Sequence, residues 1–168
     1  MSINIKLIEA GDIPSLADAF VGSPWDTPAE HFEEFLAEQD GGKRVVLVAY
    51  YQKEIAGYVT IKWQSDYPPF AERGIPEIND LRVLPAFRRR GIASALVDEA
   101  ERRTFERSPR VGIGVGMYAD YGPAQRMYVL RGYVPDGRGL CHRNKFVVAG
   151  ERVPVDDDLV LYFIKERP

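Results

Sequence analysis

The stretch LRVLPAFRRRGIASALVDEAERR, residues 81–103, places three consecutive arginines directly before a glycine and a helical pattern. A helix is predicted from Gly91 to about Arg107, because apolar residues recur there at helical spacing. These residues are Ile92, Ala93, Leu96, Val97 and Ala100.

The start of this helix is predicted to bind an anion. A helix N-terminus offers backbone N–H groups and the positive end of the helix dipole, and a glycine lets the backbone approach a bulky group closely. Residues 88–93 therefore predict a phosphate-binding turn, to which Arg88, Arg89 and Arg90 add charge-assisted hydrogen bonds. A solvated run of surface charge before a plain hinge at Gly91 is the alternative.

The length and composition favour one globular domain, residues 1–168. A chain of 168 residues with 45% hydrophobic and 28% charged residues can bury one substantial core. No apolar run approaches the ~20 residues that a membrane-spanning helix needs. The first residues, MSINIKLIEAGD, lack the basic and apolar blocks of a signal peptide, so we expect a cytoplasmic protein.

Charge and cysteine content argue against several classes of function. The formal net charge is −3 and the pI is about 5.5, so neither nucleic acid nor an anionic membrane is expected as a partner. Cys141 is the only cysteine, so no intrachain disulfide can form. His31 and His142 lie too far apart in the sequence to indicate a metal site, and no metal is expected.

The first part of the chain predicts one strand and two helices. Residues 3–10 alternate as a half-buried strand does, and Asp12 begins a short helix that ends at Phe20. The second helix has Thr27 as N-cap, Pro28 in its first turn and Glu30 as the capping-box acid. It ends at the glycines that follow residue 40, and its apolar face is formed by Phe32, Phe35 and Leu36.

A hairpin and a third strand follow. Residues 44–52 and 55–63 are rich in β-branched and aromatic residues and are joined by the polar link Lys53-Glu54. Residues 64–76 carry three prolines and predict a loop, and residues 77–83 predict a strand.

The last part predicts a glycine-rich strand over residues 110–117, a helix over 122–132 and a strand over 158–166. Glycines alternate with bulky residues in the first of these strands, so one of its faces is bare and would allow close approach to the backbone. Residues 133–157 are left unassigned. The order of elements predicts a mixed α/β (α+β) fold around a central, mostly antiparallel sheet.

The segment VLPAFRRRGIA, residues 83–93, resembles the acyl-coenzyme A binding motif of the GNAT N-acetyltransferase superfamily. Arg88, Gly91 and Ala93 occupy the three fixed positions of that motif. The segment AQRMYVLRGY, residues 124–133, resembles a second signature of the family. The order of elements also matches over nearly the whole chain, which implies a GNAT-like fold. Tyr121 stands where the family often has asparagine.

The resemblance implies acetyl-coenzyme A as the acyl donor. Its pantetheine arm would lie between the strand that ends at Val83 and the strand around Val115, where the glycines leave room. The backbone near Leu81 and Val83 would pair with the pantetheine amides and donate to the developing oxyanion. The cofactor-binding residues implied in this way are Leu81, Val83, Arg88, Arg89, Arg90, Gly91, Ile92, Ala93, Ser94 and Tyr121.

The resemblance also implies direct attack by a primary amine, without a covalent enzyme intermediate. Glu77 is the candidate base, with an ordinary charged residue at a strand start as the alternative reading; Asp80 would replace it if a bulge turned that side chain. Tyr128 is the candidate acid for the departing thiolate, with core packing as its alternative. Leu81 is the third residue assigned to catalysis, and Cys141 is expected to be a bystander.

Other readings remain open at this stage. Residues 114–119 fit the loose dinucleotide pattern Gly-x-Gly-x-x-Ala, but they lie within a strand and not in the turn after one. A non-catalytic acyl-coenzyme A sensor or interaction module of GNAT fold is the main alternative. Small amines, amino acids, polyamines and protein N-termini are all possible acceptors, and the acidity of the chain favours a cationic one. An edge strand near the C-terminus could pair across a homodimer.

Overall fold

The computed structural model describes residues 2–168, which form two compact units. Unit 1 contains the chain up to Trp63 together with Ile78–Arg103, and unit 2 contains Gln64–Glu77 together with Thr104–Pro168. Both units combine helices with antiparallel strand pairs. The predicted mixed α/β class with mostly antiparallel strands is therefore confirmed.

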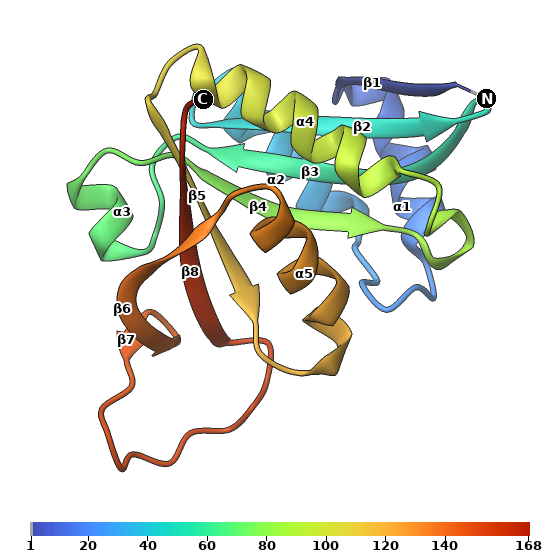
Figure 1. Cartoon of the computed structure of the whole chain (residues 1–168). Coiled ribbons are helices and arrows are strands. Elements are labelled where there is room, and N and C mark those ends of the chain that lie inside the picture. The colour runs from blue at the N-terminus through green and yellow to red at the C-terminus, as the bar shows by residue number, and fades with distance from the viewer. Residues whose placement is uncertain (1) are drawn as a thin grey trace. The chain divides into compact units, whose positions relative to one another are not determined.

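Strands β1 to β4 are neighbours in the order of the chain (Figure 1). They are β1 (Ile3–Leu7), β2 (Arg44–Tyr51), β3 (Glu54–Lys62) and β4 (Glu77–Val83), of which Glu77 alone belongs to unit 2. The predicted hairpin between β2 and β3 is confirmed. Its turn lies one residue earlier than expected, because Gln52 and Lys53 take the positive φ angles, 51° and 73°, that a two-residue type I′ turn requires.

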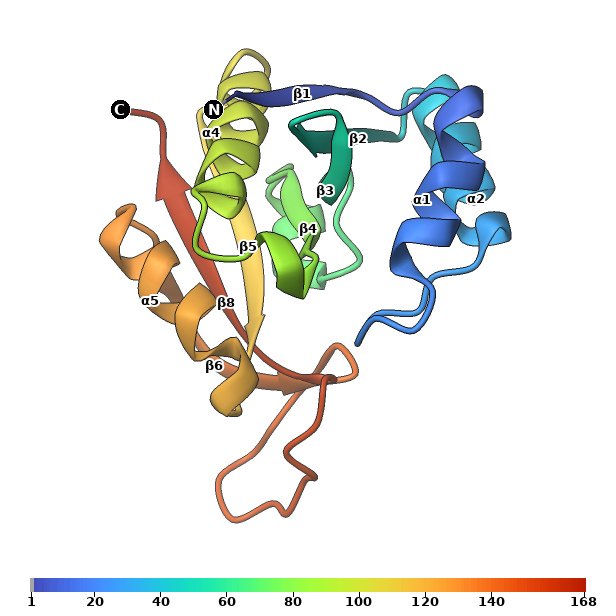
Figure 2. The same ribbon diagram turned by 90° about the vertical axis from the view of Figure 1, so that its right-hand side faces the viewer.

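Helices cover both faces of the unit 1 strands. Helices α1 (Ile13–Phe20) and α2 (Ala29–Asp40) lie side by side on one face, and α4 (Ile92–Phe105) lies on the other (Figures 1 and 2). The buried core on the α1 and α2 side is rich in aromatic rings. It contains Ile8, Ile13, Leu16, Phe20, Phe32, Phe35, Val46, Val48, Ile55, Tyr58 and Leu84.

The predicted cap of the second helix is wrong. Pro28 is the N-cap of α2, and no side chain caps this helix. The Thr27 hydroxyl instead donates to the carbonyl oxygen of Trp25 at 2.6 Å, so it is not available to the first turn of the helix. Phe32 and Phe35 are buried and Leu36 packs against the same core, as the helical pattern predicts.

Unit 2 contains the strand order β5-β8-β6-β7 and two further helices. Its elements are α3 (Pro68–Glu72), β5 (Arg110–Gly116), α5 (Gly122–Leu130), β6 (Val134–His142), β7 (Lys145–Phe146) and β8 (Leu159–Glu166). Tyr67, Phe70, Ile75, Cys141, Tyr162 and Ile164 form its buried cluster. The unassigned segment thus supplies β6 and β7.

Two expectations for this unit need correction. The predicted loop at residues 64–76 contains the short helix α3, whose first turn tolerates prolines because its N–H groups need no acceptor within the helix. The C-terminal strand β8 pairs with both β5 and β6, so it is not an edge strand. The edge of this strand order is the two-residue β7, and the homodimer stays a prediction. Within residues 2–168, no helix has the length and apolar content needed to cross a membrane.

Candidate functional site

The predicted phosphate turn lies in unit 1, between the end of β4 and the start of α4. Strand β4 is followed by a short 3-10 helix, Pro85–Phe87, and by an extended Arg88. Arg89 and Gly91 then take positive φ angles of 61° and 79°. Turns with left-handed residues before a helix are among the backbone arrangements that bind anions through N–H groups.

The first turn of α4 can hold an anion. Its first intrahelical hydrogen bond runs from Ala95 N to Gly91 O at 3.0 Å, so the N–H groups of Ile92 and Ala93 have no acceptor within the helix. The first turn contains no acidic residue. A Cβ atom placed on Gly91 would have no atom within 4 Å, so the space beside this backbone is open.

Aromatic rings hold two of the three exposed arginines. The Arg88 guanidinium lies 5.3 Å from the centroid of the Trp25 ring, and Arg90 lies 5.1 Å from that of Tyr51. Cation–π contacts of this kind limit the movement of the guanidinium groups. The structure thus brings together the predicted residues of the turn, namely Arg88, Arg89, Arg90, Gly91, Ile92, Ala93 and Ser94.

Strand β4 carries a backbone irregularity at Asp80, whose φ of 52° lies in the left-handed region. Leu81 and Val83, the residues assigned to the pantetheine, follow it and are half-buried. Asp80 Oδ1 lies 3.5 Å from Arg82 Nη2. Glu77 is the candidate base, and Asp80 would replace it if a bulge turned the Asp80 side chain. Sequence patterns do not locate such bulges.

Glu77 lies in unit 2, where its carboxylate is buried beside a serine. Ser65 Oγ donates to Glu77 Oε2 at 2.5 Å, and the exposed fractions of the two side chains are 3% and 6%. Ser65 Oγ also accepts a hydrogen bond from Tyr67 N at 3.0 Å. The hydroxyl proton is therefore directed to the carboxylate, which fixes its orientation.

Two stacked tyrosines lie in the same buried region. The rings of Tyr67 and Tyr162 are parallel, with centroids 3.7 Å apart, and the Tyr67 hydroxyl donates to Asp136 at 2.6 Å. Burial raises the pKa of Tyr67 and of Tyr162, and the negative charge of Glu77 raises the pKa of Tyr162 further. No sequence pattern indicates these tyrosines and their partner, because Asp136 is 69 residues from Tyr67 and no motif connects them.

The two remaining predicted tyrosines also belong to unit 2. Tyr128 in α5 is only 4% exposed and its ring lies 5.8 Å from that of Tyr133, so it does pack in the core. Burial raises the pKa of Tyr128, which keeps the phenol protonated at neutral pH. The Tyr121 hydroxyl donates to Asp157 at 2.8 Å. The catalytic and cofactor roles of these residues stay predictions.

The bare face of β5 is filled by the protein itself. A Cβ on Gly112 would overlap the Phe70 ring, one on Gly114 would lie 2.8 Å from Tyr162 Cε1, and one on Gly116 would overlap the Tyr121 ring. The expectation that these glycines leave room for a cofactor is therefore wrong for this face. Their missing side chains make room for aromatic rings of unit 2.

A cluster of one histidine and two carboxylates was missed by the sequence analysis. Atoms of His142, Asp156 and Asp158 lie within 4.8 Å of one another. Its members already have partners, because His142 Nε2 lies 3.1 Å from Asp156 Oδ1 and Arg143 donates to Asp158 at 3.1 Å. Cys141 is buried, and burial raises the pKa of its thiol, which makes it a poor nucleophile.

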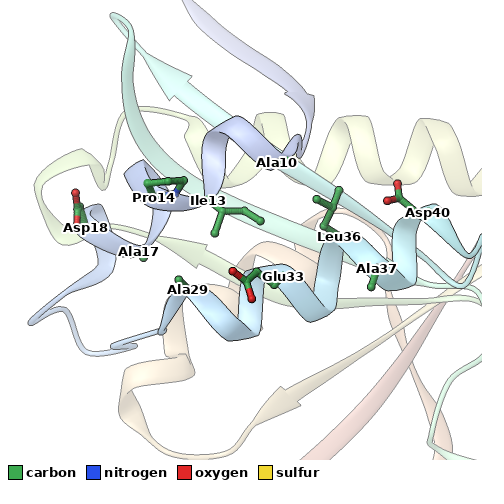
Figure 3. Close-up of a pocket in the computed structure, with 10 residues that line it drawn as sticks. All are labelled: Ala10, Ile13, Pro14, Ala17, Asp18, Ala29, Glu33, Leu36, Ala37 and Asp40. Atoms are coloured by element: carbon green, nitrogen blue, oxygen red, sulfur yellow. The ribbon is translucent and has the colours of Figure 1, made fainter.

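A groove of about 600 Å³ lies between α1 and α2 and contains none of the predicted site residues (Figure 3). Its floor is made mostly of alanines, and three carboxylates lie along it. The lining residues are Ala10, Ile13, Pro14, Ala17, Asp18, Ala29, Glu33, Leu36, Ala37 and Asp40.

Comparison with solved structures shows that the fold is shared with acetyltransferases. A protein described as an acetyltransferase of the GNAT family from Desulfovibrio desulfuricans superposes with a TM-score of 0.72 at 16% identity, over 98% of this chain and 99% of that one. Ribosomal-protein-alanine N-acetyltransferase from Brucella melitensis gives 0.70 at 19% identity, over 98% and 99%. NAA60 from Arabidopsis thaliana, solved with acetyl-CoA, gives 0.69 at 20% identity, over 98% of each chain.

The sequence comparison identifies the family. A search of curated proteins gave no match. The model of the acetyltransferase (GNAT) family, in contrast, matches residues 13–133, which is more than half of the chain and includes both predicted motifs. The chain therefore belongs to the GNAT acetyltransferase family.

Proposed function

We propose that this protein is an N-acetyltransferase that moves the acetyl group of acetyl-CoA to the primary amine of a small molecule or a peptide. Membership of the GNAT family supports an acyltransferase. Similar structures include one described as a ribosomal-protein-alanine N-acetyltransferase and one bound to acetyl-CoA. These similarities suggest the donor and the type of acceptor atom, and leave the acceptor molecule to be found.

The observation that carries the proposal is the turn at residues 88–94. It combines an open, left-handed glycine, the start of a 14-residue helix without acidic residues in its first turn, and arginines supported by aromatic rings. Backbone N–H groups and guanidinium groups are the donors that a pyrophosphate prefers. We assign the pyrophosphate of acetyl-CoA to this turn, and the pantetheine to the backbone near Leu81 and Val83.

The reaction needs one base and one acid. The amine nitrogen attacks the thioester carbonyl carbon, the C–S bond breaks, and the acetyl group forms an amide. We assign removal of the proton from the amine to Glu77, directly or through water, and protonation of the thiolate to Tyr128, which stays protonated at neutral pH because burial raises its pKa. A backbone N–H near Leu81 would stabilise the oxyanion.

Calorimetric titration with acetyl-CoA tests the proposal. Gly91→Glu places a side chain and a negative charge in the turn and should abolish micromolar binding. Gly42→Glu is the matched control, because Gly42 is also exposed, has a positive φ of 72° and has no atom within 4 Å of an added Cβ. Dephospho-coenzyme A, which keeps the pyrophosphate, should still bind. A folded wild-type protein that does not bind acetyl-CoA would refute the assignment.

A non-catalytic acyl-CoA-binding module is the second candidate. It is favoured by Tyr121, which stands at a position where the family often has asparagine and whose hydroxyl is held by Asp157. Such a module would bind acetyl-CoA equally well after Glu77→Gln and Tyr128→Phe and would release no thiol with any amine. An enzyme would lose turnover in both variants.

A further inference from the structure

Arg82 lies farther from its acidic partner than Arg110 and Arg143 lie from theirs. Its Nη2 lies 3.5 Å from Asp80 Oδ1, beyond the usual 2.7–2.9 Å of a charge-assisted hydrogen bond. The corresponding N–O distances are 2.8 Å for Arg110 and Glu166 and 3.1 Å for Arg143 and Asp158. The Nε atom of Arg82 is also buried without an acceptor. A guanidinium in this state can accept a better anionic partner.

The surroundings of Arg82 add positive charge. Arg82 and Arg88 each place their Cζ atom 5.3 Å from the centroid of the same Trp25 ring. Two cations therefore share one indole, next to the exposed Arg89, and Asp80 is the acidic partner of Arg82 in this cluster. Like charges at short range raise the free energy of the site, and an added anion lowers it.

The backbone at Asp80 indicates that this arrangement is maintained at a cost. Its φ of 52° lies within a strand, where a non-glycine residue is strained. The buried Tyr58 lies near both side chains. Burial raises its pKa, the charge of Asp80 raises it further, and Arg82 opposes the rise through its charge and a hydrogen bond. The side chains of Arg82 and Asp80 keep exposed fractions of 30% and 29%, so a ligand can reach them.

We infer that the acceptor is an amine that also carries a carboxylate, as an amino acid does, with its carboxylate held by the Arg82 guanidinium beside Trp25. The inference rests on the proposed function. The planar guanidinium matches a carboxylate in a bidentate manner, and Asp80, 3.5 Å away, is positioned to face the amino group of the same molecule. In an α-amino acid these two groups are separated by one carbon, which suits so short a spacing.

A polyamine fits this cluster poorly. It carries no carboxylate, and the Arg82 guanidinium would repel its ammonium groups, whereas Arg88 is assigned to the pyrophosphate of acetyl-CoA. The net charge of −3 for the whole chain favours a cationic acceptor, but the nearby guanidinium groups act at shorter range than the distributed acidic residues. The positive charge of Arg82 therefore outweighs the net charge of the chain in selecting the acceptor.

Matched pairs of amines test the inference. Thiol release from acetyl-CoA is measured with L-lysine and cadaverine, L-tyrosine and tyramine, and L-leucine and isoamylamine, which differ only in the carboxylate. The carboxylated member of each pair should be favoured about 10- to 100-fold in kcat/KM, as expected for a hydrogen-bonded charged group. Calorimetric binding of the same compounds, with coenzyme A present, gives a second measurement that does not need turnover.

Arg82→Met should remove the preference for the carboxylated amine and keep acetyl-CoA binding. Arg82→Lys should retain part of that preference, and it serves as the test if Arg82→Met does not fold. Lys43→Gln, which removes one exposed cation of the same unit, should leave the preference unchanged. Equal use of both members, a preference for the decarboxylated amines, no binding of any carboxylated member, or a preference that survives Arg82→Met would each overturn the inference. Discrimination in binding without thiol release would support the inference and refute the proposed catalysis.

Discussion

The hydroxyl of Ser65 donates to the carboxylate of Glu77 over 2.5 Å, and both groups are almost completely buried. Because the Ser65 oxygen also accepts a hydrogen bond from Tyr67 N, the direction of the hydroxyl proton is fixed. The residue assigned as base is thus held by a partner twelve positions earlier in the chain.

Ser65→Ala removes the donor to Glu77. We expect turnover to fall about tenfold with unchanged acetyl-CoA affinity, and the free energy of unfolding to fall by about 1–3 kcal/mol, because a buried acceptor loses one hydrogen-bond donor. Kinetics, calorimetry and urea unfolding measure these changes. Ser108→Ala is the control, since Ser108 is also buried but donates to the backbone oxygen of Arg110. Equal turnover in the two variants would contradict a role for Ser65 in holding the base.

Gly112→Ala tests how tightly β5 is packed. The added Cβ would overlap the ring of Phe70, which is fully buried and has little room to move. We expect a loss of about 1–3 kcal/mol in the free energy of unfolding, measured in urea. Gly11→Ala, where the same methyl group meets nothing within 4 Å, should change it by less than about 0.5 kcal/mol. A stable Gly112→Ala protein would show that the aromatic cluster is loose.

Tyr128→Phe removes a buried phenol and keeps its ring. If Tyr128 protonates the leaving thiolate, turnover should fall about 100-fold, in the range found for general acids, while acetyl-CoA affinity stays within about twofold. Stopped-flow thiol release and calorimetry measure the two quantities. Tyr133→Phe is the matched control, because its ring lies 5.8 Å from that of Tyr128 in the same packing. Unchanged turnover in Tyr128→Phe would refute the acid role and show that Tyr128 serves only in core packing.

Because of Glu99, the free energy of unfolding should decrease as the pH falls through the acidic range. Hydrogen bonds from Arg102, followed by those from Arg103, lower the pKa of Glu99 from 4.5 to about 2. A carboxyl group whose pKa is lower in the folded chain stabilises it above pH 4.5, and this contribution is lost as the pH falls toward 2. Solvent screening limits it to about 1 kcal/mol or less. Urea unfolding at pH 7 and pH 3 should show wild type exceeding Glu99→Gln at pH 7, with the difference shrinking at pH 3.

The elements that the sequence predicted well are those with strong local signals. The hairpin of β2 and β3 has dense β-branched residues on both sides of a short polar link, and α4 has an unbroken apolar stripe. The cap of α2 was predicted wrongly because a threonine hydroxyl has several backbone partners within reach, and Thr27 bonds to Trp25. Helix α3 was missed because proline in a first turn and proline in a loop look alike in sequence.

The candidate site shows the same division between local and distant signals. The turn at residues 88–94, to which we assign the phosphate, was predictable as a backbone feature because glycine, arginines and a helix start adjoin in the chain. The partners of Glu77 were not, because Ser65 and Tyr162 come close to it only through tertiary packing. The glycines of β5 were misread, since an absent side chain does not reveal whether a ligand or a neighbouring ring takes its place.

The chain passes from one unit to the other after Trp63, after Glu77 and after Arg103. Residues 78–103, which carry the turn proposed to bind phosphate, therefore interrupt the polypeptide of unit 2. No single truncation releases either unit intact: a fragment ending at Arg103 would keep Phe70 but lose Gly112 and Tyr162, against which its ring packs. Grafting the proposed cofactor-binding turn onto another scaffold would require two splice junctions, one on each side of the inserted segment.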